Sequence, residues 1–116
     1  MRFQQHINNV LKINVILDSG AADVSIATDV ATTLIRTGTI EKFDWLEGKV
    51  YTFADGSSAK SERFKLRSIV IGKRELHNVT CRIDNSIHAP ILLGQSALRQ
   101  LGRYTIDYKK GVIQFE

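Results

Sequence analysis

One carboxylate in this chain stands where an apolar strand is expected to end in a tight turn. Asp18 follows the run from Val15 to Leu17 and is followed at once by Ser19 and Gly20. A carboxylate at the end of a buried strand is costly unless it is hydrogen-bonded, paired or used in chemistry. A positioned carboxylate can act as a general acid or base, so Asp18 is the first candidate for a catalytic group.

The same three residues also have an ordinary structural interpretation. Asp and Ser side chains bond to nearby backbone and Gly accepts positive φ, so Asp-Ser-Gly is also the composition of a simple turn. A second segment favours the functional interpretation. Residues 91–94, Ile-Leu-Leu-Gly, form another apolar run that ends in glycine and precedes a short helix-like segment. The order of these segments carries more weight than the triplet alone.

The elements that must position these residues are mostly strands. Apolar runs and apolar–polar alternation predict strands at residues 10–17, 24–27, 49–53, 60–71, 75–83, 91–93, 104–108 and 112–115. Residues 2–7 are a candidate partner for the first of these strands, across a turn at Asn8-Asn9.

Two short helices are expected between the strands. Residues 28–36 have an apolar face at helical spacing, with Thr28 or Asp29 as the capping residue. Residues 96–100 predict a second helix, which ends at Gly102.

Length and composition indicate one domain over residues 1–116 of ordinary globular type. The chain is 43% hydrophobic and 24% charged, with a net charge of +4. Its Lys and Arg residues are dispersed and carry no nucleic-acid-binding fingerprint, so we expect no nucleic-acid partner. No membrane-spanning segment or signal peptide is visible, which favours a cytoplasmic location. The lone Cys81 is expected to be a buried structural residue.

The histidines do not support a competing chemistry. Ser19 with His77 or His88 suggests a serine hydrolase only superficially, because Ser19 lacks the strand–turn–helix context of a nucleophilic elbow. His6, His77 and His88 do not have metal-ligand spacing. We therefore expect no metal and no other cofactor.

Taken in order, the segments from about Val10 to Gly102 resemble the retropepsin-like aspartic proteases. The shared pattern is an apolar strand, Asp-Ser-Gly-Ala, a strand, a flap hairpin, further strands, Leu-Leu-Gly and a short helix. Residues 51–56, 92–96 and 104–108 are most similar to bacterial single-domain members. The resemblance implies an all-β fold, a closed β-barrel of the acid-protease type with one or two short helices and one half-site per chain.

The resemblance also implies roles for the residues of the first loop. Asp18 is the expected catalytic carboxylate. Ser19, Gly20 and Ala21 complete the active-site loop, where Ser19 bonds across a dimer axis and Gly20 allows close approach of substrate backbone. Because the chain carries one such triplet, it supplies half of an active site and requires a homodimer.

Further roles follow from the same resemblance. A flap hairpin over about 49–66 is expected to close over the substrate with a tip formed by Ala54, Asp55, Gly56 and Ser57. Leu93 and Gly94 are expected to support the loop that bears Asp18. The expected activity is that of an aspartic endopeptidase, in which a water activated between two Asp18 carboxylates hydrolyses bonds of a peptide or protein substrate at acidic to weakly acidic pH.

The chain departs from retroviral enzymes at two positions. Those enzymes commonly place an acid at the position of Ala22 and an Arg at that of Gln95, and the two groups pair. Both are missing here, so Ala22 and Asp23 are the expected substrate-binding positions, with Asp23 taking part of the acid's role. The departure supports an alternative function, a catalytically weak or inactive retropepsin-like module for dimerisation or peptide binding.

Two further features allow more than one interpretation. The final hairpin, residues 104–116, is expected either to supply the dimer sheet or to complete the core of one chain. Phe43 and Trp45 lie in a segment expected to be irregular, where they either line the cleft or anchor the loop. Tyr51 is a candidate hydrogen-bonding residue near the active site, like the flap tyrosine of two-lobed relatives.

Overall fold

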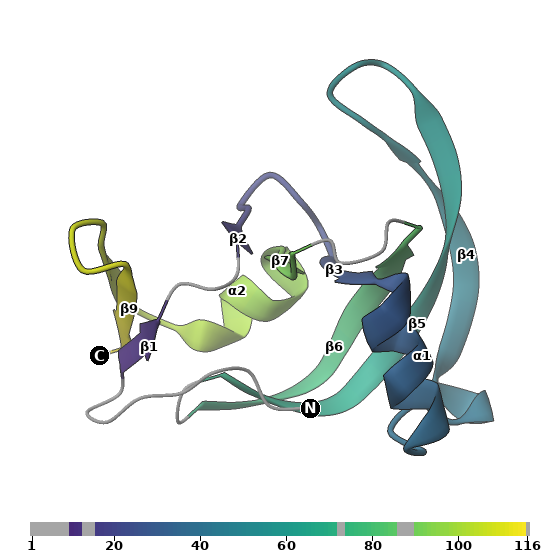
Figure 1. The fold of residues 1–116 in the computed structure, drawn as a ribbon, viewed down its shortest axis with the longest axis horizontal. Helices are drawn as coiled ribbons and strands as arrows, with labels where there is room; N and C mark the ends of the chain where they lie inside the picture. The colour runs from purple at the N-terminus through teal and green to yellow at the C-terminus, as the bar shows by residue number, and fades with distance from the viewer. Residues whose placement is uncertain (1–9, 13–15, 72–73, 86–89, 116) are drawn as a thin grey trace.

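The computed structural model describes residues 10–12, 16–71, 74–85 and 90–115, and this part of the chain is mostly β, with two short α-helices (Figure 1). Both features agree with the sequence prediction. The predicted pairing of residues 2–7 and the positions of His6 and His88 lie outside the described residues. In the described residues, no helix is both long and apolar enough to cross a membrane.

Six strands form the sheet that carries the candidate site. In spatial order they are β2 (Ile16–Leu17), β7 (Leu92–Leu93), β3 (Val24–Ala27), β6 (Arg74–Asp84), β5 (Ser58–Ile71) and β4 (Trp45–Thr52). β2 runs parallel to β7 and β3 parallel to β6, whereas the other neighbours are antiparallel. Closure would require β2 to pair with β4. These two are the sheet's edges in the described chain, so the predicted closed barrel is not confirmed.

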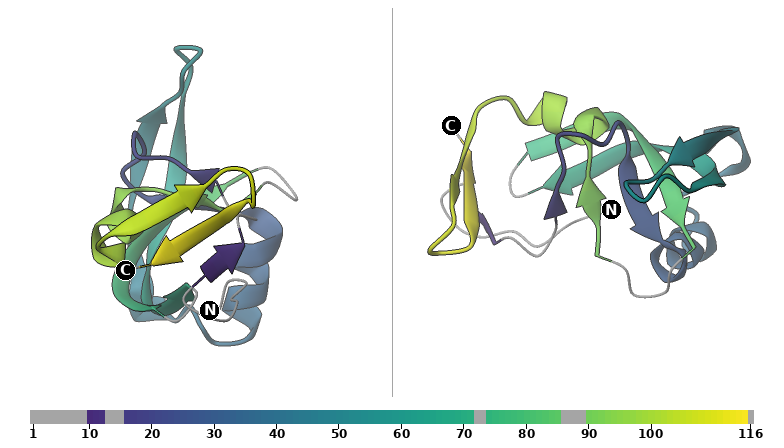
Figure 2. Two further views of the ribbon diagram at one scale, coloured as in Figure 1. Left: turned by 90° about the vertical axis from the view of Figure 1, so that its left-hand side faces the viewer. Right: turned by 90° about the horizontal axis from the view of Figure 1, so that it is seen from above.

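A long hairpin formed by β4 and β5 projects from the body of the protein (Figures 1 and 2). Its strands are longer than the predicted 49–53 and 60–71, because pairing begins at Trp45 and continues up to the turn. The register shifts between Leu46 and Lys49, which is a bulge in β4. A bulge bends the strand that carries it, so this irregularity affects the direction in which the hairpin tip points.

The predicted C-terminal hairpin forms a separate three-stranded sheet. β8 (Tyr104–Asp107) pairs with β9 (Val112–Phe115), and β9 pairs on its other side with β1 (Val10–Lys12). Ile113 of β9 is fully buried in the hydrophobic core. The hairpin therefore completes the core of its own chain, while β1 and β8 remain at the edges of this sheet.

The helices agree closely with their predicted positions, but one capping prediction is wrong. α1 spans Thr28–Arg36 and packs on β3 and β6, and α2 spans Gln95–Leu101 and packs on β6, β3 and β7. The N-cap of α1 is Ala27, with no side-chain cap. The Thr28 hydroxyl instead donates to the carbonyl of Asp84, which ties the helix start to the end of β6. α2 ends, as predicted, at Gly102 with φ of 71°.

The two longest strands contribute many of the side chains of the core. Their buried side chains are Phe64, Leu66, Ile69 and Ile71 on β5 and Leu76, Val79 and Cys81 on β6. Burial raises the pKa of the Cys81 thiol, so little reactive thiolate forms. Cys81 is therefore a packing residue, as the sequence predicts.

Trp45 and Phe43 lie in two different regular elements, whereas the sequence predicted one irregular segment. Trp45 begins β4, and its ring packs edge-on against Phe64 with the centroids 5.8 Å apart. Phe43 lies in the 3-10 helix η2 (Lys42–Asp44), where the Arg67 guanidinium covers its ring at 5.0 Å. Neither aromatic residue lines the cleft described below, so the interpretation of Trp45 as an anchor is the one that agrees with the structure.

Gly94 lies where β7 leads into α2. Its backbone packs directly against the backbone of the loop between β2 and β3. A Cβ atom at this position would lie 2.3 Å from the carbonyl oxygen of Asp23 and 2.8 Å from that of Ala21. Both neighbours are backbone atoms, which cannot move aside as a flexible side chain can. The two segments pack this closely only because residue 94 lacks a side chain.

Replacing Gly94 by Ala is expected to destabilise the fold by about 3 kcal/mol or more, because the backbone must shift to admit the new methyl group. Urea denaturation followed by circular dichroism measures this change. Gly48→Ala is the control, since its new Cβ would first meet the flexible end of Lys60. Equal stability of the two variants would contradict the close packing at Gly94.

Candidate active site

Asp18 is the first residue after β2 and begins the loop that leads to β3. Its amide donates to the Leu93 carbonyl at 3.0 Å, so its backbone is held by β7. Its Oδ1 accepts a 3.0 Å hydrogen bond from the amide of Gly20, and the amide of Ala21 donates to its carbonyl. The turn interpretation and the functional interpretation therefore describe one geometry: a tight Asx-type turn that holds a half-exposed carboxylate.

The start of α2 holds this loop through hydrogen bonds. The amides of Gln95 and Ser96 donate to the carbonyls of Ala21 and Ala22, each at 2.8 Å. The Gln95 side chain donates to the Ser19 carbonyl, also at 2.8 Å. The sequence indicated Gln95 only as the position where retroviral enzymes commonly have an Arg. Its amide side chain is in fact a direct support of the loop.

Opposite the loop lies the tip of the β4–β5 hairpin, residues 53–57. The amide of Phe53 donates to the Ser57 carbonyl, and Gly56 takes the positive φ of 86° that the turn requires. The Asp55 carboxylate accepts hydrogen bonds from the Ser57 hydroxyl and amide, and these bonds lower the pKa of Asp55. Asp55 is thus a turn residue, which agrees with its sequence interpretation.

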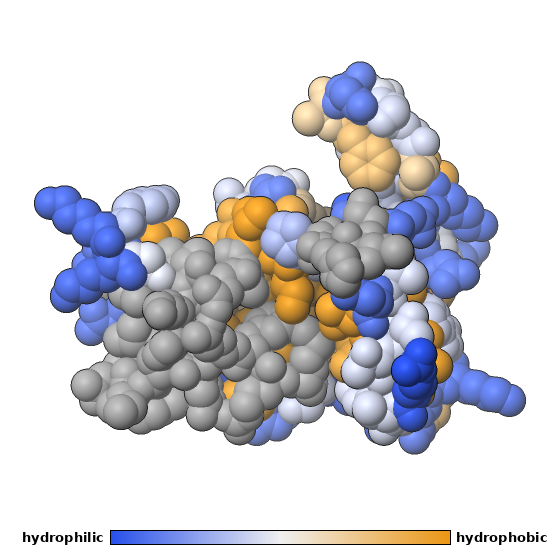
Figure 3. Space-filling view, in the orientation of Figure 1, coloured by the Kyte–Doolittle hydropathy of each residue, from blue (hydrophilic) through white to orange (hydrophobic). Residues whose placement is uncertain are grey.

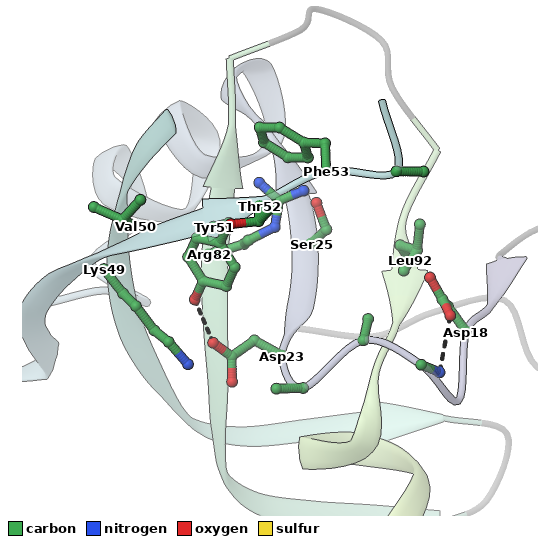
Figure 4. Close-up of a pocket in the computed structure, with 14 residues that line it drawn as sticks. Asp18, Asp23, Ser25, Lys49, Val50, Tyr51, Thr52, Phe53, Arg82 and Leu92 are labelled. Carbon is green, nitrogen blue, oxygen red and sulfur yellow. Dashed lines mark hydrogen bonds between the residues drawn. The ribbon is translucent and has the colours of Figure 1, made fainter. Parts of the chain in front are cut away.

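A cleft of about 510 Å³ separates the loop from the hairpin (Figures 3 and 4). This volume lies in the ordinary range of ligand sites. Its walls come from the loop, the hairpin, β3, β6 and β7, and include Asp18, Gly20, Ala21, Ala22, Asp23, Ser25, Lys49, Val50, Tyr51, Thr52, Phe53, Ala54, Arg82 and Leu92. The structure thus brings the loop and the hairpin, the two predicted parts of the site within one chain, to one cavity.

Asp23 is bonded to the hairpin across this cleft. Its side chain is only 9% exposed, and its Oδ2 accepts a 2.5 Å hydrogen bond from the Tyr51 hydroxyl (Figure 4). Nε of Arg63 lies 3.5 Å from the same oxygen and has no hydrogen-bond partner, so Arg63 contributes charge rather than a directed bond. The candidate substrate-binding acid is therefore already engaged within the chain.

Tyr51 lies on β4 and makes the kind of hydrogen bond that the sequence suggested only by analogy. Burial, the hydrogen bond to Asp23 and the charge of that carboxylate raise the pKa of Tyr51 to about 12. The neutral phenol is the form that donates to Asp23. The only sequence signal for this pair was the presence of an unpaired acid after the loop and a tyrosine near the hairpin tip.

Of the residues that suggested competing chemistries, the structure describes Ser19 and His77, and no hydrogen bond joins these two. His77 lies on β6, is exposed with its ring 3.9 Å from Glu75, and does not line the cleft that contains the Asp18 loop. In the part of the chain that the structure describes, no group of three His, Cys, Asp or Glu side chains is arranged to hold a metal ion.

Comparison with known proteins agrees with this geometry. Residues 3–100 match the family described as gag-polyprotein putative aspartyl protease. Among solved structures, the fold is similar to a retropepsin-like aspartic protease from Rickettsia conorii, with a TM-score of 0.57 and 27% sequence identity. That match covers 90% of this chain and 84% of the other. The comparison with curated proteins gives no match.

Replacing Tyr51 by Phe is expected to reduce the free energy of unfolding by about 1–3 kcal/mol near neutral pH, because it leaves the buried Asp23 without its hydroxyl donor. The raised pKa of Tyr51 also predicts a pH dependence. Its stabilising effect is complete below the unfolded-state pKa of 10.0 and is lost as the pH rises towards about 12.

Urea denaturation at neutral and alkaline pH tests both parts of this prediction. Tyr108→Phe is the matched control, because Tyr108 is 85% exposed. The loss of stability between pH 10 and 12 should be smaller in Tyr51→Phe than in the wild type and unchanged in Tyr108→Phe. The same alkaline loss in all three proteins would contradict the role given to Tyr51.

Proposed function

The chain belongs to the gag-polyprotein putative aspartyl protease family and is retropepsin-like, and on this premise we propose that it is an aspartic endopeptidase active as a homodimer. One observation carries the proposal. The Asp18 carboxylate ends an edge strand, is fixed by its own loop, and opens into a cleft of peptide-binding size. The proposed enzyme is one domain over residues 1–116.

The homodimer follows from the number of carboxylates that the chemistry needs. Each chain contributes one Asp-Ser-Gly loop, and β2, which leads into it, is an edge strand of its sheet. A second copy can therefore approach from this side and place its own Asp18 beside the first. The Ser19 hydroxyl has no hydrogen bond within the described chain and is exposed, which suits the proposed bond across the dimer axis.

In the proposed dimer, the two Asp18 carboxyls share one proton. Like charges held this close cannot both ionise, a behaviour already established for the aspartic-protease pair. The ionised carboxylate takes a proton from a water molecule, and the oxygen of that water attacks the peptide carbonyl carbon. The neutral carboxyl gives its proton to the carbonyl oxygen. When the C–N bond breaks, the first carboxyl gives its proton to the amine, the second takes a proton from a hydroxyl of the tetrahedral diol, and the pair is again singly protonated.

The substrate in this proposal is an extended peptide between loop and hairpin, bound as an added strand. Gly20 lets its backbone approach the carboxylates, and Ala22 and Asp23 form part of the binding wall. The hairpin tip, Ala54, Asp55, Gly56 and Ser57, acts as a flap. Leu93 and Gly94 support the loop through the packing and hydrogen bonds described above.

Asp18→Asn is expected to reduce peptide cleavage by a factor of roughly a thousand or more, since it removes the group that activates water. The measurement is mass spectrometry of a diverse peptide pool incubated with each protein from about pH 3 to 7, where cleavage should be strongest on the acidic side because one carboxyl must stay protonated. Glu75→Gln is the control, because it removes an exposed carboxylate outside the cleft.

Sedimentation at the same protein concentrations gives the oligomeric state. The Asp18→Asn variant should remain dimeric, because losing the like-charge repulsion favours association. Cuts that persist in this variant would contradict the proposed mechanism. A dimeric wild-type protein that cuts nothing would instead support the peptide-binding module, and a protein monomeric at high concentration would contradict the homodimer.

A further inference from the structure

Arg82 is a cation in the cleft that the proposed mechanism does not use. It extends from β6, and its guanidinium carbon lies 5.1 Å from the centroid of the Tyr51 ring and 5.7 Å from that of Phe53 (Figure 4). Both rings belong to the hairpin that covers the cleft. Stacking on aromatic faces holds a guanidinium in place without using its N–H groups, which point outward in its plane.

Most of these N–H groups have no strong partner in the described chain. Nη1 is 3.5 Å from the Ser61 hydroxyl, at the limit of a hydrogen bond. No described carboxylate lies within 4 Å of Arg82, and the buried acid of the cleft, Asp23, is engaged by Tyr51 and Arg63. A planar guanidinium with free donors is suited to a carboxylate, which it can bind through two parallel hydrogen bonds.

The charges around Arg82 favour the same ligand. Lys49 is a second cation on the cleft wall, and it also has no ion pair with a described residue. Of the two acids that line the cleft, Asp23 lies 3.5 Å from Nε of Arg63, whose charge offsets its own, and Asp18 lies apart from Arg82 across the cleft (Figure 4). The region beneath the hairpin therefore carries uncompensated positive charge.

We infer that Arg82 forms a subsite for an acidic side chain of the substrate. This inference rests on the proposed function and adds a specificity to it: the enzyme favours peptides with Glu or Asp at the position that faces Arg82. Because Arg82 and Asp18 lie apart, this position is removed from the bond that is cut rather than adjacent to the reacting carbonyl.

The experiment compares pairs of peptides that differ only by Glu against Gln at each position around a cleavage site found with the wild-type protein. At one position the Glu peptide should be cut with about tenfold higher kcat/KM, the effect expected of hydrogen bonds to a charged group. Arg82→Gln should abolish this preference, so that the Glu and Gln peptides are cut with equal kcat/KM. Arg82→Glu should reverse it, so that a Lys peptide is favoured.

Lys65→Gln is the matched control, because it removes an exposed cation of the neighbouring strand β5 that does not line the cleft. It should retain the full preference for Glu. If the Arg82 variants lose cleavage of Glu and Gln peptides in equal proportion, Arg82 only holds the hairpin in place, and the inference is overturned. It is also overturned if the wild type shows no preference or if the preference survives in Arg82→Gln.

A binding measurement separates this inference from the proposed function. Fluorescence anisotropy of labelled peptides with Asp18→Asn reports the subsite without any cleavage. Tighter binding of the Glu peptide, lost in the Asp18→Asn/Arg82→Gln double variant, supports the subsite even if the wild type cuts nothing. Cleavage that depends on Asp18 with no difference in binding would leave the protease intact and refute the subsite.

Discussion

The geometry of the site depends on the packing of the loop from Asp18 to Asp23 against the start of α2. Three hydrogen bonds act there: the amides of Gln95 and Ser96 and the Gln95 side chain donate to carbonyls of the loop. Gly94 allows these partners to come within reach, since a side chain would collide with the loop backbone. The position of the Asp18 carboxylate thus depends on these supports of its loop, together with the hydrogen bond that its Oδ1 accepts from the Gly20 amide.

The two carboxylates of the cleft have different environments. Asp23 is buried and tied to Tyr51 and Arg63, so it joins the loop to the hairpin. Asp18 has only the amide of Gly20 as a partner in the described chain and remains half-exposed. A buried acid without partners would be costly, whereas a half-exposed carboxylate with one amide partner stays accessible to a ligand. Each acid therefore has an environment that suits a different task.

The sequence was sufficient to predict most of the strands and both helices. Alternation and glycine positions are local signals, and the hydrophobic effect makes them reliable where one face of an element is buried, as in β5 and β6. Sheet closure was not predictable in this way, because it depends on whether the edge strands β2 and β4 meet. The cap of α1 was mispredicted because Thr28 bonds the distant Asp84 carbonyl instead of its own helix.

The candidate site, like the fold, could be predicted only in part from the sequence. Its loop residues are adjacent in sequence, and so Asp18 could be identified from the triplet. The partners of Asp23 could not, because Tyr51 and Arg63 are brought to it by the fold from another hairpin. The interpretation of Trp45 as an anchor needed the position of Phe64, which only the register of β4 and β5 supplies.

The departure at Ala22 and Gln95 goes with different contacts of the loop. In the retroviral pattern the acid and the Arg pair with each other, and the acid also binds the substrate backbone. Here the Gln95 side chain instead donates to the Ser19 carbonyl of the loop, and the nearby acid, Asp23, accepts a hydrogen bond from the hairpin. Any movement of the hairpin that breaks the Tyr51 bond leaves a buried carboxylate without its donor, which is unfavourable. Opening of the cleft is therefore opposed by a specific interaction within one chain.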